Sequence, residues 1–542
     1  MSRGHELGFL GRPRDPGEVA LVHGGREFTF GDVAALGADV GDLVRSQRLG
    51  RRVVGVPAER GPGFVARLAG VWGAGAVPAI LGEWGAERVR GALTATRAAA
   101  AFTPSGGLEP LDTTAPEQPD ETSHILFTSG TTGRPKGIVV GRTAFEAAIT
   151  AFFKELPVDA ADRVAFLGRP GHDPSLRELV APWVTGATLF IPDRSTAADP
   201  RLLAGWLAEH SITVLQAAPV LLQLVAGTAP RPVESLRLVC SAGARLTAAT
   251  LRAAARLAPH ATVANCYGAS ETPQVLCMHR IPPGQAVLSE DPIPIGRPLG
   301  HAVVKIVPAG EGRLYVEAAA CALGYTDGTP LTAPGQDGRR WYDTGDLVRV
   351  LPDGSLSFVR RADRQVQVNG ARVELDEIEG AAALVPGVLA ATATFAEDGA
   401  GVGSVRLTVV ATATTPEEVR AVLRDHLDPA VMPSTIEVRD ARPPVVPAEE
   451  PAFEAGGQPA GAGAVGLMEV LRACARSALG GGEIDPDGGF FEAGFTSMSL
   501  MAFVSEVSVR LGTEISPLLV FQYPSLNSFA GHLTAVRESE GG

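Results

Sequence analysis

Short apolar runs and helix-like stretches alternate along the first part of the chain. Between residues 20 and 102, runs such as ALV, RVVGV and VPAIL are separated by stretches rich in Ala, Leu and Val. Continuous apolar runs of this length are typical of parallel strands that are buried on both faces and connected by helices. The pattern therefore predicts an α/β layer with parallel strands.

The same alternation of short apolar runs and helix-like stretches occurs between residues 142 and 260. It predicts a helix near 142–155, strands at 163–167 and 187–191, a helix near 200–209 and a strand at 212–216. These elements form a second α/β half. Residues 104–121, which are rich in proline and acidic side chains, form a loop ahead of it.

The C-terminal part, from residue 441 on, is predicted to contain a linker and helices but no strands. Residues 441–464 consist largely of Pro, Ala, Gly and Glu, which is typical of a linker. Amphipathic helices then alternate through residues 465–537, in the stretches VGLMEVLRACARSAL, SMSLMAFVSEVSVRL and SLNSFAGHLTAV. A small all-helical domain is expected there.

Length and charge narrow the classes of function. The 542 residues exceed one hydrophobic core, and a net charge of -13 disfavours nucleic acid and anionic membranes as partners. The most apolar span, residues 212–225, is interrupted by Gln216, Pro219 and Gln223, so a cytoplasmic protein is expected. The five scattered cysteines indicate neither disulfides nor a zinc site.

The stretch FTSGTTGRPKG, residues 127–137, carries the strongest chemical signal. Its glycines allow backbone N–H groups to approach an anion, its hydroxyls donate hydrogen bonds, and Lys136 adds a positive charge. The loop lacks the Gly-Lys-Ser/Thr order of a mononucleotide P-loop. It predicts a phosphate-binding loop, with an ordinary Gly/Thr turn as the alternative.

This stretch resembles the ATP-binding signature of AMP-forming adenylate ligases, the superfamily that includes the adenylation domains of nonribosomal peptide synthetases. Further motifs appear in family order: FTFGDV at 28–33, VWGAGAVPAI at 71–80, VANCYGASETP at 263–273, YDTGDL at 342–347 and RRADRQVQVNGARVELDEIE at 360–379. The resemblance covers nearly the whole chain. It implies the biosynthesis of secondary metabolites such as antibiotics.

The resemblance implies a fold and a set of boundaries. The fold class is α/β, with a large two-sheet αβα N-terminal part that carries a small β-barrel, a small α+β C-terminal lid, and an all-α four-helix carrier domain. The expected divisions are 1–362 for the large part, 363–440 for the lid, 441–464 for the linker and 465–540 for the peptidyl carrier domain. A hinge is expected at Asp363, and Gly370 is expected to face the thiol during transfer.

The resemblance also implies how the chain binds Mg·ATP. Tyr267 is suited to stack on adenine, Glu271 to bind Mg²⁺, and Asp346 to accept both ribose hydroxyls. The residues expected to act in catalysis are Lys136, Glu271 and Thr131. Those expected to bind ATP and AMP are Thr128, Ser129, Gly130, Thr132, Gly133, Tyr267, Gly268, Ser270, Asp346 and Arg361.

The stretch GHDPSLREL, residues 171–179, carries the expected contact to the substrate. Asp173 followed by proline suits a helix N-cap, and in the family the matching Asp pairs with the ammonium group of an α-amino acid. The expected substrate pocket comprises Asp173, Pro174, Arg177, Gln216, Cys240, Ala242, Cys266, Gln274 and Val275. Arg177 with two glutamines indicates a polar side chain on the amino acid, acidic or amide-bearing.

The helical C-terminal part resembles a carrier protein. Its stretch FFEAGFTSMSL matches the attachment motif and places Ser497 at the start of the second helix, where 4'-phosphopantetheine would be attached. A helix N-terminus favours the phosphodiester, and a plain N-cap is the alternative. The implied partners are a phosphopantetheinyl transferase, condensation or tailoring enzymes, and a small MbtH-like activator.

One departure from the family puts the activity in question. The family carries a lysine in a C-terminal PxTxNGK loop, whereas this chain reads RPPVVPAEEPAF and has no lysine after Lys305. Loss of one preorganised charge costs about 10² to 10³ in rate, and Arg439 or Arg442 would be an imperfect substitute. Two alternatives therefore stay open: a scaffold whose carrier is loaded in trans, and an aryl or acyl acid ligase, which Asp173 argues against.

Overall fold

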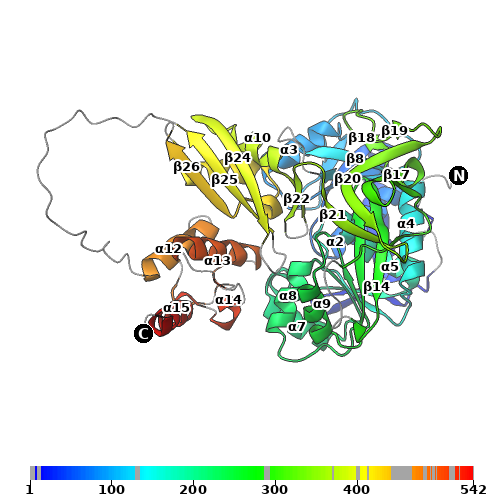
Figure 1. The fold of residues 1–542 in the computed structure, drawn as a ribbon. Coiled ribbons are helices and arrows are strands. Elements are labelled where there is room, and N and C mark those ends of the chain that lie inside the picture. Colours follow the sequence, from blue (N-terminus) through cyan, green and yellow to red (C-terminus); the bar gives the residue numbers. More distant parts are fainter. Residues whose placement is uncertain are drawn as a thin grey trace, which may run out of the picture. The chain divides into compact units, whose positions relative to one another are not determined.

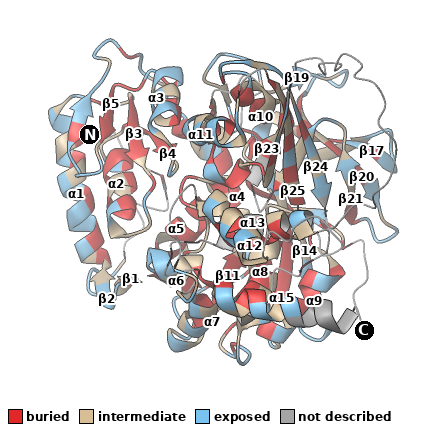
Figure 2. Ribbon diagram, turned by 90° about the vertical axis from the view of Figure 1, so that its left-hand side faces the viewer, coloured by how far each residue is buried: buried red, intermediate tan, exposed pale blue. Residues whose placement is uncertain are grey.

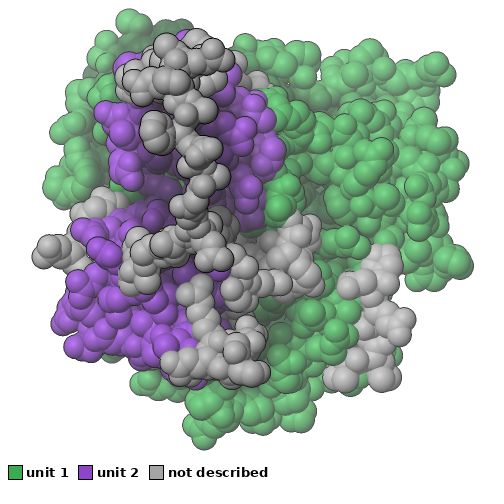
Figure 3. Space-filling model, turned by 60° about the vertical axis from the view of Figure 1, so that its left-hand side comes forward, with its two compact units in different colours: residues 1–378, 395–403, 424–432 green, residues 379–394, 404–423, 433–542 purple. Residues whose placement is uncertain are grey.

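The structure is a computed structural model of the 542-residue chain. It describes residues 7–8, 14–128, 135–285, 293–368, 371–397, 403–411, 414–440, 467–479, 485–488, 490, 493, 495, 497–511, 515, 519–523 and 525–540. The chain divides into two compact units, which Figure 3 distinguishes by colour. Unit 1 comprises residues 1–378, 395–403 and 424–432, and unit 2 comprises residues 379–394, 404–423 and 433–542.

The first large sheet of unit 1 has seven strands in the order β18-β8-β7-β4-β3-β5-β6. Its central strands pair in parallel and its outer pairs are antiparallel. The strands are β3 (Val53–Pro57), β4 (Val77–Leu81), β5 (Ala100–Phe102), β6 (Leu108–Pro110), β7 (Thr122–Thr128), β8 (Lys136–Gly141) and β18 (Gly324–Tyr325). β4 is buried along its whole length, as its run VPAIL predicted.

The second large sheet has nine strands in the order β15-β14-β13-β12-β11-β9-β10-β1-β2. The five pairs from β13 to β1 are parallel. The strands are β1 (Val19–His23), β2 (Arg26–Thr29), β9 (Arg163–Ala165), β10 (Thr188–Ile191), β11 (Val214–Ala217), β12 (Leu238–Ser241), β13 (Thr262–Ala269), β14 (Thr272–Ile281) and β15 (Arg297–Pro298). One core cluster joins apolar side chains of both sheets, such as Val56 and Leu189.

Helix α1 buries one face, as its red and pale blue sides show in Figure 2, whereas α5 is buried along most of its length. α1 begins at a capping box in which Thr29 and Asp32 satisfy each other's backbone N–H groups. α7, α8 and α9 lie side by side (Figure 1). The helices are α1 (Phe30–Ser46), α2 (Pro62–Gly73), α3 (Ala86–Ala95), α4 (Arg142–Glu155), α5 (Asp173–Thr185), α6 (Arg194–Ala198), α7 (Pro200–Glu209), α8 (Pro219–Thr228) and α9 (Ala248–Leu257).

A smaller antiparallel sheet follows in the chain. It pairs β16 with β17, β17 with β20, and β20 with both β19 and β21. The strands are β16 (Val304–Val307), β17 (Glu311–Glu317), β19 (Ala333–Pro334), β20 (Arg340–Val350) and β21 (Leu356–Arg361). The hairpin of β22 (Gln365–Val368) and β23 (Ala371–Glu374) comes next, and α10 (Leu375–Ala382) follows it.

Residues 424–432 belong to unit 1, and Asp428 makes their main polar contacts with it. The Asp428 side chain is 6% exposed, and it accepts a hydrogen bond from Trp84 Nε1 at 2.7 Å. Arg169 Nη2 lies 2.6 Å from its carboxylate, and His172 Nε2 lies 3.6 Å away. These contacts hold the carboxylate in its charged form, and its pKa is well below the usual range despite burial.

A second buried ion pair, between Arg88 and Glu377, lies in the same unit. The two side chains are 3% and 0% exposed, and Arg88 Nη1 donates to Glu377 Oε1 at 2.9 Å. Arg88 Nη1 also donates to the His426 carbonyl oxygen at 2.9 Å, and its guanidinium lies 5.1 Å from the ring of Trp84. α3 and the start of α10 are therefore joined by a charge pair shielded from water.

Unit 2 contains a three-stranded sheet and the helical C-terminal part. The strands are β24 (Val388–Glu397), β25 (Gly403–Ala411) and β26 (Thr435–Asp440), and the helix α11 (Pro416–His426) lies between β25 and β26 in sequence. Within these elements, residues 395–397, 403 and 424–426 belong to unit 1. The helices at the C-terminus are α12 (Leu467–Leu479), α13 (Ser497–Leu511), α14 (Leu519–Gln522) and α15 (Leu526–Glu540). Phe490, Phe495, Phe503 and Phe529 form an aromatic cluster among them, with ring centroids 5.3–6.4 Å apart.

The predicted elements agree with the structure to different degrees. The helices predicted at 142–155 and 200–209 are α4 and α7, with the same bounds, and α13 begins at Ser497 as predicted. The strand predicted at 163–167 ends two residues earlier, at Ala165, and the strand predicted at 212–216 is shifted to Val214–Ala217. The predicted linker lies outside the described residues, and the four domain boundaries stay predictions.

Candidate active site

The strand pair β7 and β8 encloses the predicted phosphate loop. Thr128 and Lys136 are paired across this hairpin, while Ser129, Gly130, Thr131, Thr132 and Gly133 lie outside the described residues. Lys136 Nζ lies 3.5 Å from the centre of the Tyr325 ring. Among the described residues no carboxylate forms an ion pair with Lys136, so its charge is available to an anion.

The connection between β13 and β14 carries Glu271. Its side chain is 2% exposed, and its Oε1 accepts a hydrogen bond from the Tyr325 hydroxyl at 3.2 Å. Tyr325 thus touches both Lys136 and Glu271, and the structure brings these two predicted catalytic residues to one aromatic ring. One carboxylate suits a magnesium ion that takes most of its other ligands from phosphate oxygens and water. The lysine and the carboxylate therefore fit a bound magnesium nucleotide.

Glycine is required beside this turn. A Cβ on Gly268 would lie 2.4 Å from the Gln274 carbonyl oxygen, across the hairpin. The hairpin register is irregular at this point, between Tyr267 and Ala269. Gly268 therefore allows the two strands to approach each other where Ser270 and Glu271 turn, which is a structural reason for the glycine that the family motif did not supply.

Asp346 is the centre of a second cluster. It lies on β20, is 6% exposed, and its Oδ1 accepts a hydrogen bond from Arg361 Nη1 at 2.8 Å. Its Oδ2 accepts a hydrogen bond from the Tyr267 hydroxyl. Burial, followed by the Asp346 charge, holds the pKa of Tyr267 well above its ordinary value. The predicted adenine and ribose contacts are thus directly joined.

Arg361 connects this cluster to the predicted hinge residue. Its Nε and Nη2 donate to the two carboxylate oxygens of Asp363, at 2.8 and 2.7 Å. Such a two-pronged pair holds the guanidinium plane in one orientation. Arg361 therefore spans Asp346 and Asp363. Gly370, the residue predicted to face the thiol, lies outside the described residues.

Asp173 is the first helical residue of α5. His172 occupies the N-cap position and Asp173 makes no capping bond, so the N-cap alternative for Asp173 is wrong. Its carboxylate is 5% exposed and accepts hydrogen bonds from the Gln274 backbone N–H and Nε2, both at 2.8 Å. Burial raises the pKa of Asp173 to about 7.

Gln274 also links Asp173 to the rest of the predicted pocket. Its Oε1 accepts a hydrogen bond from Arg177 Nη1 at 2.9 Å, and Arg177 Nε donates to Gln216 Oε1 at 2.9 Å. Gln274 has a φ of 68°, a left-handed conformation that is rare outside glycine and is held here by these contacts. The motif did not indicate this strained backbone.

The remaining predicted pocket residues differ in burial. Cys240, Cys266 and Val275 are buried, and the Cys266 thiol donates to the Ala264 carbonyl oxygen at 3.8 Å. Pro174 and Ala242 are half-buried. Asp173, Arg177, Gln216 and Gln274 form one connected network of polar side chains. A substrate group that entered it would meet fixed donors and acceptors.

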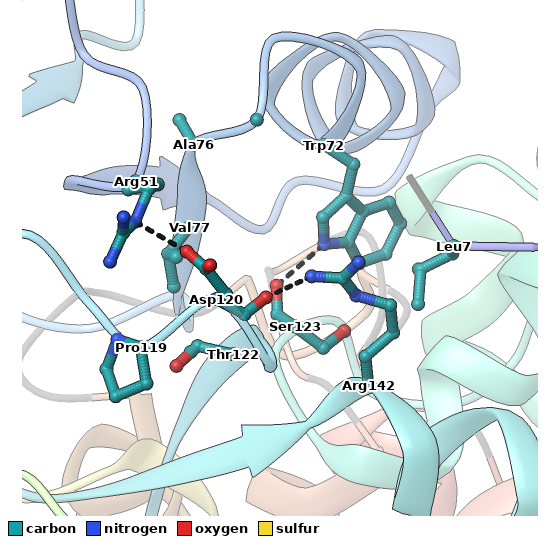
Figure 4. Close-up of a pocket in the computed structure, with 11 residues that line it drawn as sticks. Leu7, Arg51, Trp72, Ala76, Val77, Pro119, Asp120, Thr122, Ser123 and Arg142 are labelled. Atoms are coloured by element: carbon teal, nitrogen blue, oxygen red, sulfur yellow. Dashed lines mark hydrogen bonds and ion pairs between the residues drawn. The ribbon is translucent and has the colours of Figure 1, made fainter. Parts of the chain in front are cut away.

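A separate cavity lies away from all of these residues (Figure 4). Trp72 Nε1 donates to the Ser123 carbonyl oxygen at 2.9 Å there, and Arg51 Nε lies 2.9 Å from Asp120. None of the predicted site residues lines this cavity. It is therefore not a candidate for the active site.

Two protein families match the chain. The family described as AMP-binding enzyme matches residues 105–326, and the family described as phosphopantetheine attachment site matches residues 469–533. The chain is an adenylation–carrier didomain. The predicted need for ATP and for a covalently attached phosphopantetheine is thereby confirmed, and the didomain is a member of the AMP-forming ligases.

Curated relatives of the didomain are large synthetases. Phenyloxazoline synthase MbtB of Mycobacterium sp. (strain MCS) is 33% identical over 351 residues, which cover 61% of this chain and 29% of that protein. Tyrocidine synthase 3 of Brevibacillus parabrevis is 27% identical, over 97% of this chain and 9% of its own length. The didomain thus spans less than a third of either relative.

Solved structures show the fold. A holo nonribosomal peptide synthetase protein with adenylation and PCP domains, bound to a vinylsulfonamide inhibitor, has a TM-score of 0.71 at 21% identity, covering 96% of this chain and 94% of that one. The Vibrio cholerae adenylation domain AlmE, in complex with glycyl-adenosine-5'-phosphate, has a TM-score of 0.66 at 20% identity, covering 79% and 93%. These likenesses confirm the predicted fold class. Over the described residues, no helix has the length and apolarity needed to cross a bilayer.

Proposed function

We propose that the didomain activates an amino acid as its adenylate and transfers it to the pantetheine thiol on Ser497. The observation that carries this proposal is the β13–β14 hairpin, which holds Tyr267 and Glu271 beside the nucleotide residues and Gln274 beside Asp173. Residues suited to a nucleotide and to an amino acid therefore lie within eight positions of one element.

The proposed first step is an in-line displacement at phosphorus. A carboxylate oxygen of the amino acid forms a bond to the α-phosphorus of ATP while the bond to the bridging oxygen breaks and pyrophosphate leaves. Lys136 neutralises the charge on the phosphates, and Glu271 would hold the magnesium ion. Asp346 and Arg361 would orient the ribose.

The second step transfers the acyl group to the carrier. A phosphopantetheine attached at Ser497 would supply the thiol that accepts the acyl group as AMP leaves. α13 begins at Ser497, so its unpaired N-terminal N–H groups favour the phosphodiester at this position. A phosphopantetheinyl transferase is the implied partner that installs the group, and condensation or tailoring enzymes are proposed as acceptors. An MbtH-like activator and a cytoplasmic location stay predictions.

Asp173 supports an amino acid over an aryl or acyl acid. A buried carboxylate with no cation bonded to it among the described residues is suited to an ammonium group, and it has no role toward a plain acid. Asp173→Ala separates these cases. An amino acid ligase loses turnover, whereas an aryl or acyl ligase keeps it.

A second candidate function rests on the missing lysine. No lysine follows Lys305, and residues 441–466 lie outside the described residues. Arg439, one possible substitute, is bonded through Nε to Glu437 at 3.1 Å on the same strand, and Arg442 is not described. The didomain would then be a scaffold whose carrier is loaded by another enzyme.

Intact-mass measurement of the pantetheinylated didomain separates the two functions. The protein is incubated with Mg·ATP and pooled amino acids. We expect a mass increase that matches one amino acid minus water and disappears without ATP. A mass increase that requires an added ligase contradicts self-loading and supports the scaffold.

A further inference from the structure

Arg177 is the largest of the fully buried side chains. It is 2% exposed, and its guanidinium carbon lies 4.6 Å from the centre of the Phe152 ring. It follows Asp173 by four residues on α5, so the two side chains lie on one face of the helix. A charged residue in this position needs a reason, because removal of a guanidinium from water is costly unless the charge is paired.

The hydrogen bonds of Arg177 do not neutralise its charge. Nε and Nη1 donate to the amide oxygens of Gln216 and Gln274, which are neutral. Among the described residues, no carboxylate forms a salt bridge with Arg177, and no acceptor is hydrogen-bonded to its second Nη. The side chain is thus fixed in position while its charge and one donor group remain available.

Two buried carboxylates lie on the same helix as Arg177, and neither forms a salt bridge with it. Asp173 accepts two hydrogen bonds from Gln274, and Glu178 accepts one from the Gly168 N–H at 2.8 Å. Burial raises the pKa of Asp173 to about 7 and that of Glu178 to about 8, and the nearby charge of Arg177 opposes both shifts without forming a salt bridge to either group. The buried guanidinium of Arg60 adds a second positive charge close to Glu178.

The orientation of the glutamines decides between an acidic and an amide substrate. Both amide oxygens accept from Arg177, so a substrate amide could use the remaining Arg177 donor only through its own oxygen and would bring no charge to offset the guanidinium. A carboxylate would instead meet the guanidinium, the geometry in which arginine forms its strongest hydrogen bonds.

We infer that the substrate is an amino acid with a second carboxylate on its side chain, which Arg177 binds while Asp173 binds the ammonium group. This inference rests on the proposed amino acid activation. It makes Arg177 the residue that determines specificity, with Gln216 and Gln274 as positioning residues that hold its guanidinium.

The test compares isosteric pairs on the pantetheinylated didomain. Aspartate and glutamate are offered against asparagine and glutamine, and loading rates are followed by intact mass. We expect the acids to be favoured by at least about 100-fold, because a site built for one hydrogen-bonding group strongly rejects an analogue without it. Faster loading of any neutral amino acid overturns the inference and leaves amino acid activation intact.

Arg177→Met provides the second arm, with Arg252→Met, an exposed arginine on α9, as the matched control. The Arg177 variant should lose the preference for acids, and the control should keep it. An unchanged preference in a folded Arg177 variant overturns the inference.

A binding measurement keeps the two proposals distinguishable if no amino acid is loaded. Sulfamoyl analogues of the aspartyl and asparaginyl adenylates, which cannot react, are titrated by calorimetry. Tighter binding of the aspartyl analogue by the wild type, lost in Arg177→Met, supports the inference even though activation has failed. Equal binding of the two analogues overturns it.

Discussion

Lys136 is one of three lysines in the chain and lies at the end of the predicted phosphate loop. We expect Lys136→Ala to lower amino-acid-dependent ATP–pyrophosphate exchange by about 10² to 10³, the usual cost of one preorganised charge donor. Lys154, exposed near the end of α4, offers the matched control, and Lys154→Ala should leave the rate within twofold, about the scatter of surface changes. Equal rates for both variants would exclude phosphate binding by Lys136.

Asp173 should give amino acid binding a pH dependence. The carboxylate must be ionised to attract an ammonium group, and burial raises its pKa to about 7. The KM for the amino acid should therefore fall about tenfold as the pH rises from 6 to 8, while the KM for ATP stays level. A flat amino acid KM would contradict the role of Asp173.

The same pKa shift also affects the stability of the fold, and here a rise in pH is unfavourable. A carboxyl group whose pKa is raised on folding favours the folded state at low pH, and this contribution is lost as the pH rises from about 4 to about 7. A higher pH therefore favours substrate binding by Asp173 but lowers the contribution of Asp173 to the free energy of unfolding.

Residue types in this site could be predicted from the sequence, but their partners could not. The resemblance to the family placed Asp173, Arg177, Gln216 and Gln274 in one pocket. Nothing in the sequence indicated that both glutamine oxygens point at Arg177, because that depends on contacts between residues 39 and 97 positions apart. For the same reason the choice between an acidic and an amide substrate stayed open.

At the scale of elements, the pair of Arg88 and Glu377 joins α3 to the start of α10. Arg88→Met should lower the free energy of unfolding by about 3 to 5 kcal/mol, because the buried Glu377 carboxylate loses the arginine that is paired with it. Urea denaturation of the full chain, followed through the transition of unit 1, measures the loss.

Arg90→Met is the control for this change. Arg90 pairs with Glu87 at the surface, where the two side chains are 68% and 48% exposed, and such pairs contribute about 0 to 1 kcal/mol. The double variant Arg88→Met, Glu377→Met should recover part of the loss. If Arg88→Met and Arg90→Met lowered the free energy of unfolding equally, burial of the Arg88–Glu377 pair would have no energetic consequence.

Elements with a strong helical period were predicted best. α4 and α7 have the predicted bounds because their apolar residues recur at helical spacing between clear ends. Strand ends were less accurate, since an apolar run can continue past the last residue of a strand, as Phe166 and Leu167 do after Ala165. The buried pair between α3 and α10, 289 residues apart, has no signal in either segment alone.

At the scale of the whole molecule, one substitution should separate amino acid activation from the attachment of phosphopantetheine. Ser497→Ala should retain amino-acid-dependent pyrophosphate exchange and lose the mass increase from phosphopantetheine, because only the second activity needs the serine oxygen. Ser499→Ala, two residues along α13, should keep both. Retention of the mass increase in Ser497→Ala would place the attachment site elsewhere.

The contacts of Asp428 determine where the chain can be truncated without loss of part of unit 1. Unit 1 is not continuous in sequence, and a fragment that stopped after residue 378 would lack the carboxylate bonded to Trp84 and paired with Arg169. The fragment would expose an indole and leave two nitrogen donors without acceptors. Expression of the ligase part alone, or exchange of carrier domains between synthetases, therefore requires a junction on the C-terminal side of residue 432.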